Sequence, residues 1–283
     1  MKGQVESGKS GWKENALPIA IVLILAIIIL GRAGYLPFLG NIPLIGSWFK
    51  VGTIKVVVIG QASDGLISKF NDFQFKRANI ELQVFSRPEE INDLSSQALS
   101  QFDVVILDGT AYCSRETRQA LLNYMQINGK MIVIGDACTK LVGDPNVCGW
   151  SIGLVNLGDY VPVKVCGTTH VRTPVSTTEV NGQITVSGIA FDHPIFQSLK
   201  NFGFSGQVWT NVEINNDGPA PDILAWVDQG TSPGTQSNVG IVESQGTLGW
   251  KTIYFAYDIG ADPVPTSSTL LLNTILYLKN VKA

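Results

Sequence analysis

The chain has 283 residues, of which 45% are hydrophobic and 15% are charged. Average soluble domains carry about 25% charged residues, so this chain is apolar, and its varied composition excludes a disordered protein. The residues before Thr53 include five basic and two acidic side chains, a net charge of +3, whereas the rest include fifteen and twenty-one, a net charge of −6. An acidic body without a basic stripe argues against nucleic acid as a partner, because phosphate binding depends on clustered Lys and Arg.

Residues 16–30 form a long apolar run, ALPIAIVLILAIIIL, which contains no charge. With one residue on either side it spans residues 15–31, which reaches the lower length limit of a membrane-spanning helix. We therefore expect a transmembrane helix over residues 15–31. A cytoplasmic tail (residues 1–14) would precede it, and an apolar, Gly- and Pro-rich linker (residues 32–52) would follow it.

Two other interpretations of the apolar run remain open. It can be a helix buried in a protein core, or a cleaved signal peptide with the small residues Gly31 and Ala33 at its cleavage site. The stretch after it, residues 34–49, is also apolar and favours a retained anchor lying at the membrane surface. Three lysines precede the span and two basic residues follow it, which predicts a single-pass protein of the cell membrane with its N-terminus cytoplasmic and its body outside.

The first part of the body alternates between strand-like and helix-like segments. Residues 53–60 read TIKVVVIG, a β-branched run ending in glycine, as expected of a strand that is covered on both faces in a parallel sheet. Further segments continue this alternation: strands at residues 80–85, 102–108 and 130–135, and helices at residues 88–101 and 114–128. The spacing is that of βαβ units, so we expect right-handed crossovers and a mostly parallel sheet.

After Cys138 the pattern changes to short strand-like runs separated by turn residues. These runs predict added antiparallel strands or a covering ribbon, at residues 160–166, 183–186, 207–214, 222–227 and 238–243. The chain ends with a strand at residues 251–258 and a helix at residues 267–279, which are expected to return to the central sheet. No internal repeat is visible, so residues 53–283 are expected to form one α/β domain.

Five motifs in a fixed order give the body a family resemblance. They are IKVVVIG at residues 54–60, FDVVILDG at 102–109, NGKMIVIGDA at 128–137, AFDHPIF at 190–196 and GWKTIYFAYDIG at 249–260, followed by a helix with Asn273 and Leu276. In this order the body resembles a class I glutamine amidotransferase-like domain, in the broad sense that includes trehalose-utilisation-like members. The resemblance implies a flavodoxin-like or amidotransferase-like, mostly parallel sheet flanked by helices with added antiparallel strands.

The same resemblance implies a position for the catalytic nucleophile, which this chain does not fill. Members that hydrolyse amides carry a G-x-C-x-G elbow after the strand that here ends near Gly135, so that backbone N–H groups stabilise the oxyanion and an imidazole takes the thiol proton. If Gly135 is the first glycine, Ala137 occupies the nucleophile position. If Cys138 is the nucleophile, Asp136 replaces that glycine. Neither register fits, which favours a domain that lacks the family's chemistry.

Only two histidines are available as a catalytic base, His170 and His193. The final strand ends in Tyr257 and Asp258, where catalytic members of the family are expected to carry the partner histidine. His193 precedes a proline in the segment AFDHPIF, and we interpret it as a buried or capping imidazole, with catalysis as the alternative.

The four cysteines are Cys113, Cys138, Cys148 and Cys166, an even number that suits disulfides outside a reducing compartment. One pairing joins Cys138 to Cys148 across a turn and Cys113 to Cys166. A competing pairing joins Cys113 to Cys138, because both follow parallel strands near one edge of the sheet. Either pairing oxidises Cys138 and removes it as a nucleophile. A structural zinc site and unpaired buried thiols are the remaining alternatives.

Three aspartates, Asp108, Asp136 and Asp258, each follow a strand expected in the central sheet. Ligands of open α/β sheets bind beyond the carboxyl ends of the strands, so these carboxylates are candidates to bind a ligand or a hard cation such as Mg²⁺ or Ca²⁺. Capping and turn formation are the alternative roles of these side chains.

These observations lead to three functional hypotheses. The first is a membrane-anchored, extracytoplasmic binding or scaffold domain without catalytic activity, which contacts membrane lipid and a membrane or cell-surface protein and needs no cofactor. The second is a divergent hydrolase or amidase that uses Cys138 or a metal bound by the strand-end carboxylates. The third is a pilin-like subunit whose apolar helix packs in a filament.

Overall fold

The computed structural model describes residues 26–27, 52–108, 112–152, 155–164, 171–174, 182–210, 212–228 and 238–280. The chain divides into two units at Gly52 and Thr53, and the second unit, Thr53–Ala283, is described below. Apart from residues 26–27 and 52, the expected transmembrane helix and linker lie outside the described residues. Within the described ranges, no helix is long and apolar enough to cross a membrane.

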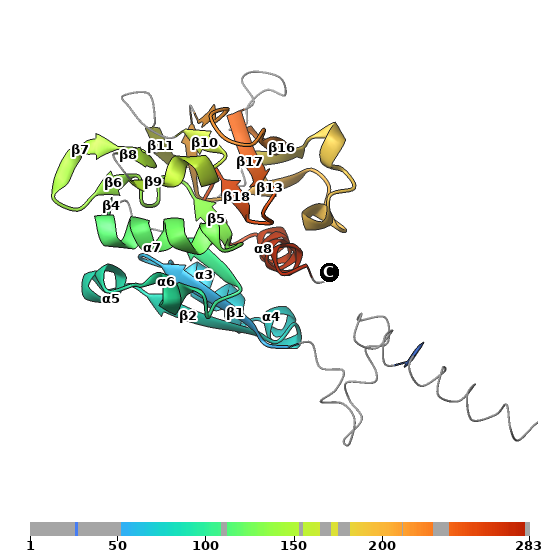
Figure 1. Cartoon of the computed structure of the whole chain (residues 1–283). Helices are drawn as coiled ribbons and strands as arrows, with labels where there is room; N and C mark the ends of the chain where they lie inside the picture. The colour runs from blue at the N-terminus through green and yellow to red at the C-terminus, as the bar shows by residue number, and fades with distance from the viewer. Residues whose placement is uncertain are drawn as a thin grey trace, which may run out of the picture. The chain divides into compact units, whose positions relative to one another are not determined.

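A nine-stranded sheet forms the centre of the body (Figure 1). Its strand order is β13-β12-β16-β17-β18-β5-β3-β1-β2. Five neighbouring strands are parallel: β18 (Lys251–Phe255), β5 (Lys130–Ile134), β3 (Val104–Leu107), β1 (Ile54–Ile59) and β2 (Ile80–Phe85). Four antiparallel strands extend the sheet beyond β18: β17 (Asn238–Gln245), β16 (Asp222–Asp228), β12 (Gly182–Val186) and β13 (Phe202–Phe204). The mixed sheet with added antiparallel strands agrees with the expected fold class.

Four small sheets lie outside the central one. They pair β10 (Val163–Lys164) with β15 (Glu213–Ile214), β11 (Val171–Pro174) with β14 (Gln207–Thr210), β8 (Ser151–Ile152) with β9 (Val155–Asn156), and β6 (Lys140–Leu141) with both β4 (Tyr112–Cys113) and β7 (Asp144–Cys148). The covering ribbon and the added sheet strands, which the sequence presents as alternatives, are therefore both present.

The helices are short, apart from α7 and α8. They are α3 (Asp64–Asn71), α4 (Phe73–Arg77), α5 (Pro88–Asn92), α6 (Ser96–Leu99), α7 (Arg115–Gln126) and α8 (Pro265–Leu278), with 3₁₀-helices η2 (Leu157–Tyr160), η3 (Gly188–Ala190) and η4 (Pro194–Phe196). The step from β1 to β2 moves outward in the sheet and the step from β2 to β3 moves back across it. Right-handed crossovers therefore place α3 and α4 on one face and α5 and α6 on the other, where they pack with α7.

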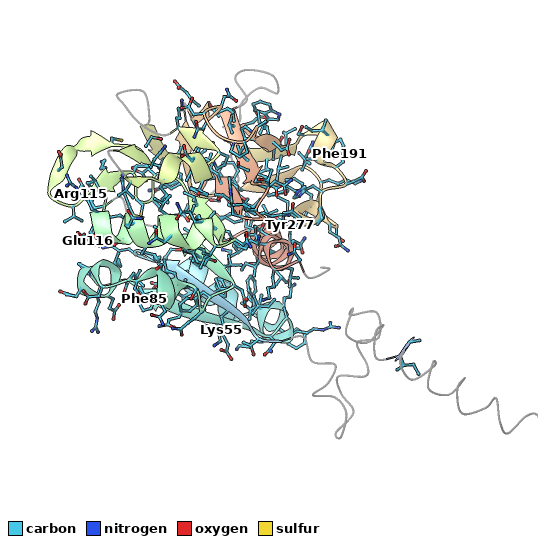
Figure 2. The ribbon with its side chains drawn as sticks, viewed as in Figure 1. Lys55, Phe85, Arg115, Glu116, Phe191 and Tyr277 are labelled. Carbon is cyan, nitrogen blue, oxygen red and sulfur yellow. A yellow bond between two sulfur atoms is a disulfide. The ribbon has the colours of Figure 1, made fainter. Side chains whose placement is uncertain are left out.

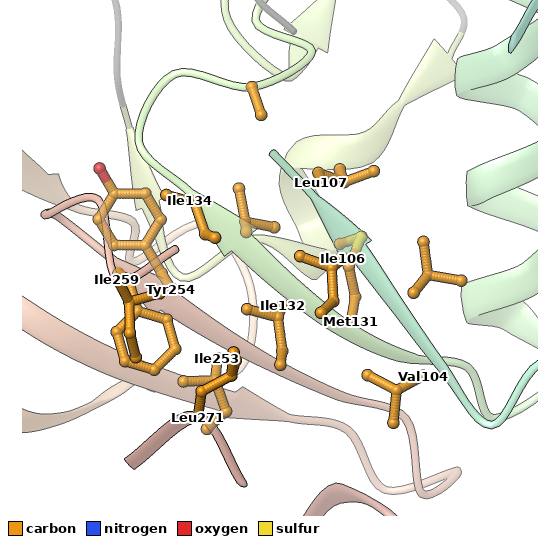
Figure 3. Packing of buried hydrophobic residues seen from close by; sticks show 14 of the residues in the cluster. Val104, Ile106, Leu107, Met131, Ile132, Ile134, Ile253, Tyr254, Ile259 and Leu271 are labelled. Atoms are coloured by element: carbon orange, nitrogen blue, oxygen red, sulfur yellow. The ribbon is translucent and has the colours of Figure 1, made fainter. Parts of the chain in front are cut away.

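The core forms where the parallel strands align their β-branched side chains. In one row across the sheet, Val58 is paired with Ile106, Ile106 with Ile132, and Ile132 with Ile253. All four side chains are completely buried. Figure 3 shows Ile106, Ile132 and Ile253 in contact with the surrounding aliphatic side chains. Strands covered on both faces explain why these segments read as continuous apolar runs.

Three sequence expectations need correction. The single helix expected at residues 88–101 is two helices, because Ser95 starts a new one: its Oγ accepts a hydrogen bond from the N–H of Ala98 at 3.1 Å. The strand expected at residues 207–214 is divided between β14 and β15, which belong to different sheets. Of the strand expected at residues 160–166, the described part contains only β10, since Tyr160 ends η2.

Candidate functional site

The turn after β5 is where an amidotransferase would carry its nucleophile, and here a disulfide occupies it. Cys138 is bonded to Cys113, with Cα atoms 4.9 Å apart. The two residues meet because β3 and β5 are neighbours in the sheet and each cysteine follows one of them. The pairing of Cys138 with Cys148 is therefore wrong. Cys148 is also disulfide-bonded, and Cys166 lies outside the described residues.

This turn is closed to solvent. Ala137 and Cys138 are at most 2% exposed, and Cys138 adopts a left-handed backbone conformation with φ of 58°. The indole of Trp150 donates to the carbonyl of Ala137 at 3.0 Å, and Nη2 of Arg118 donates to the carbonyl of Cys138 at 2.6 Å. Burial lowers the pKa of Arg118 to about 10. The carbonyls of the turn are thus bound by buried side chains, and the sulfur of Cys138 is buried with them.

Trp209 of β14 covers the adjoining strand ends. Its backbone N–H donates to the carbonyl of Ala256 at 2.6 Å, and its indole N–H donates to Oδ1 of Asp136 at 3.1 Å. The indole lies so close to Gly135, whose φ is 60°, that a β-carbon there would be 2.2 Å from the ring. The crevice that binds ligands in open α/β sheets is therefore filled by the protein's own chain at β5 and β18.

The three strand-end aspartates are not grouped as metal ligands in the described residues. No group of three His, Cys, Asp or Glu residues is placed to hold a metal ion in the part of the chain that the structure describes. Asp136 accepts from Trp209, and Oδ1 of Asp258 accepts from the N–H of Ala261 at 2.9 Å. Asp108 is buried beside Gly260. A β-carbon added at Gly260 would lie 3.3 Å from Oδ2 of Asp108. The structure thus describes no shared Mg²⁺ or Ca²⁺ site at these residues, and two of the carboxylates accept hydrogen bonds from nearby N–H groups; the cation site stays a prediction.

A buried polar network closes the carboxyl end of the sheet between α3 and α8. Nζ of Lys69 donates to the carbonyls of Gly260 and Asp262 at 2.8 and 2.5 Å. The carboxylate of Asp262 accepts from the backbone N–H of Ser205 at 3.0 Å and from the hydroxyl of Ser267. Burial lowers the pKa of Lys69 and raises that of Asp262. Because these groups satisfy one another, the network fixes the loop between β18 and α8.

An accessible concave surface lies elsewhere, between η4 and the end of α8. A cleft of about 1270 Å³ is lined by residues 191–194 and 196–200, with Tyr277 and Asn280. Figure 2 shows Phe191 and Tyr277 on the same side of the body. Concave surfaces with a few convergent polar groups are the usual ligand or partner sites of proteins.

A hydrogen-bonded network forms the base of this cleft. Buried Glu243 of β17 bonds to Nε2 of His193 through Oε2 at 2.9 Å, and through Oε1 it accepts from the hydroxyl of Tyr277 at 2.7 Å. Nζ of Lys251, the first residue of β18, donates to the same hydroxyl at 2.8 Å. The network thus lies toward the amino end of β18, whereas Cys138 and Asp258 follow the carboxyl ends of their strands.

The network has a consistent electrostatic pattern. Burial alone would raise the pKa of Glu243, but the hydrogen bonds from His193 and Tyr277 bring it below its usual value. Burial, together with the nearby Glu243 carboxylate, raises the pKa of Tyr277. The carboxylate is therefore held in its charged form and the phenol in its neutral, donating form.

His193 has a structural role in this arrangement. Its Nδ1 accepts from the N–H of Ile195 at 3.4 Å and caps η4, as the capping interpretation predicts. An Nδ1 that accepts leaves Nε2 as the protonated nitrogen that donates to Glu243. With both nitrogens engaged in hydrogen bonds, the imidazole links η4 to β17.

Asn273 of α8 holds the same segment from the other side. Its buried side-chain amide donates to the carbonyls of Ile195 and Gln197, both at 3.2 Å. Sequence analysis placed Asn273 in the final helix and His193 in the AFDHPIF motif, but it missed Glu243, Lys251 and Tyr277. No local sequence signal marks these three residues. Glu243, for example, lies in an apolar strand, where a glutamate usually indicates a solvent-facing position.

Comparisons with known proteins identify the fold. Neither a comparison with protein families nor one with curated proteins finds a match. Among solved structures, a ThuA-like protein from Bacteroides uniformis ATCC 8492 is similar, with a TM-score of 0.51 and 12% identity over 81% of this chain and 93% of that chain.

Two β-galactosidases contain a similar region. The enzymes from Rahnella sp. R3 and Bacillus circulans sp. alkalophilus give TM-scores of 0.52 and 0.53 at 9% and 11% identity. Both matches cover 84% of this chain but only 33% of the β-galactosidase chain, so the likeness concerns one part of each enzyme. At these identities the likeness shows the fold alone, and the body of this chain has the amidotransferase-like α/β fold of the ThuA-like protein.

Proposed function

We propose that the chain is a membrane-anchored, extracytoplasmic binding domain that has the amidotransferase-like fold but turns over no substrate. The observation that carries this proposal is the disulfide between Cys113 and Cys138. A cysteine nucleophile acts as its thiolate, and a sulfur already bonded to a second sulfur has no thiolate to offer. The burial of the turn and the position of Trp209 support the same conclusion.

The cleft beside η4 is the binding surface in this proposal. It is open to solvent, and it is lined by an exposed aromatic side chain, Phe191, together with amide and hydroxyl groups. The buried network of His193, Glu243 and Asn273 holds the segment that forms its wall. A wall fixed before binding lowers the entropy that binding costs.

The proposed location rests on two features. Disulfides persist in oxidising compartments, which supports a body outside the cytoplasm. The charge-free run at residues 16–30 supports the anchor, and the lysines before it support a cytoplasmic N-terminus. Membrane lipid and a membrane or cell-surface protein are the partners that such a placement implies.

Thiol labelling tests the absence of nucleophilic chemistry. The native full chain is treated with iodoacetamide without reductant and its intact mass is measured. We expect no adduct, and adducts on the four cysteines only after unfolding in reductant. An adduct on Cys138 in the native protein that disappears in a Cys138→Ser variant would refute the proposal.

Membrane extraction and protease protection test the location. We expect the chain to stay with membranes in alkaline carbonate and its body to be digested by protease added to intact cells. Recovery of the full-length chain in the carbonate supernatant contradicts the anchor. Digestion only after the cells are opened contradicts the orientation.

A further inference from the structure

Two large apolar side chains project from the segment beside the cleft. Ile189 is 84% exposed and Phe191 is 59% exposed, and they lie two residues apart at the junction of η3 and η4. Phe191 also lines the cleft, so a projection and a hollow are neighbours on one surface. Single exposed apolar side chains are normal in proteins, whereas a pair beside an open cleft marks an interaction surface.

The segment that carries these side chains is rigid at its base. The imidazole of His193 is bonded to Glu243, and the amide of Asn273 is bonded to the carbonyls of Ile195 and Gln197. The partly buried His193 and the buried Glu243 and Asn273 thus hold a surface segment of about a dozen residues. The apolar projection is fixed before any partner arrives, as in interfaces whose central residues are preorganised.

The charges beside the projection are complementary to each other. Asp192 and Lys200 both line the cleft and both are exposed. Neither forms a salt bridge with another residue in the described ranges. In a two-fold dimer the same surface patch of both copies forms the interface. A patch that carries a carboxylate, an ammonium group, a projecting side chain and a cleft can therefore place each of these groups against its complement on the second copy.

We propose that this surface, residues 189–200 with Tyr277 and Asn280, is a two-fold interface between two copies of the chain. The Phe191 ring of each copy enters the cleft of the other, and Asp192 of each copy pairs with Lys200 of the other. The inference rests on the proposed function, since it assigns a partner to the binding surface of a domain without catalytic activity. The partner is a second copy because one patch carries both the projecting ring and the cleft that accepts it, and both members of the charge pair.

Sedimentation of the full chain in mild detergent, over a wide range of concentration, tests the interface. We expect a monomer–dimer equilibrium that Phe191→Ala shifts toward monomer by about 100-fold or more in Kd, because both central aromatic side chains are lost. Phe73→Ala is the matched control: Phe73 is 75% exposed on α4, outside this surface, and its loss should leave the Kd unchanged. All substituted side chains are exposed, so the fold is retained, which circular dichroism checks.

A charge exchange gives the second arm of the test. Asp192→Lys and Lys200→Asp should each weaken the dimer, because each places like charges opposite one another, and the double variant should restore it. A chain that is monomeric at all concentrations, a dimer that Phe191→Ala leaves intact, or a double variant no tighter than the single ones overturns the interface.

The two proposals fail in distinguishable ways. A monomer whose thiols resist labelling overturns the interface and leaves the proposed function in place. A dimer whose Cys138 is labelled in the native state does the reverse.

Discussion

The disulfide between Cys113 and Cys138 is predicted to supply a large part of the body's stability. It closes a loop with a sequence separation of 25 residues. The chain-entropy relation for a loop of this length gives about 3.5 kcal/mol at room temperature. Both residues are buried in the core, and truncating each buried sulfur to alanine adds about 1 kcal/mol of lost packing. A Cys113→Ala/Cys138→Ala variant should therefore lose about 5.5 kcal/mol of unfolding free energy.

Urea unfolding of the two proteins, followed by circular dichroism without reductant, measures this loss. Because domains are stable by only about 5–15 kcal/mol, the comparison is made at about 10–20 °C, where domains are typically most stable. The dependence of the free energy on urea should also be steeper in the variant, since its unfolded chain is less compact. A loss below about 2 kcal/mol with an unchanged slope would refute the reasoning, because it would mean that the cross-link restricts neither state.

Three further predictions have defined outcomes. Gly135→Ala should cost about 3 kcal/mol or more in urea unfolding, since its β-carbon would overlap the indole of Trp209. The control is Gly143→Ala, which should cost about 1 kcal/mol, because Gly143 has a φ of 83° but open space around it. Equal costs would contradict the steric argument. Asn273→Ala should cost about 2 kcal/mol and expose the segment around η4 to limited proteolysis, because the buried carbonyl of Ile195 and the partly buried carbonyl of Gln197 lose their donor. Glu243 has a pKa below the ordinary 4.5 in the folded state, so its stabilisation is present above pH 4.5 and is lost as the pH falls through the folded value. Urea midpoints should thus show Glu243→Gln less stable than the wild-type protein at neutral pH, with a gap that closes in acid; a constant gap would contradict the prediction.

Hydrophobic pattern and capping residues predict much of the fold, because both act over a few residues. The β-branched run of β1 and the runs of β3 and β5 lie within one residue or two of their predicted positions. Ser114 caps α7 by accepting from the N–H of Thr117 at 3.0 Å, as expected for a helix beginning there. The helix expected at residues 88–101 fails because a second cap inside the segment divides it.

The candidate site was less predictable, because its residues are brought together by strand order. The resemblance to an amidotransferase-like domain correctly directed attention to the turn at Gly135 and Cys138. It included His193 in the AFDHPIF motif but gave no information on its partner Glu243, which is 50 residues away in the sequence. The strand-end aspartates were predicted to converge, but two of them accept hydrogen bonds from N–H groups: Asp136 from the distant Trp209 and Asp258 from the neighbouring Ala261.

The sequence by itself determined that this chain has an α/β body with a buried parallel sheet, since continuous β-branched runs are stable only when both faces are covered. It also determined that the turn after β5 lacks the amidotransferase motif. The tertiary structure decided which cysteine pairs with Cys138, because the adjacency of β3 and β5 is a property of the sheet as a whole. It likewise decided that the open cleft lies toward the amino end of β18, where side chains from β17, β18 and α8 meet around Glu243.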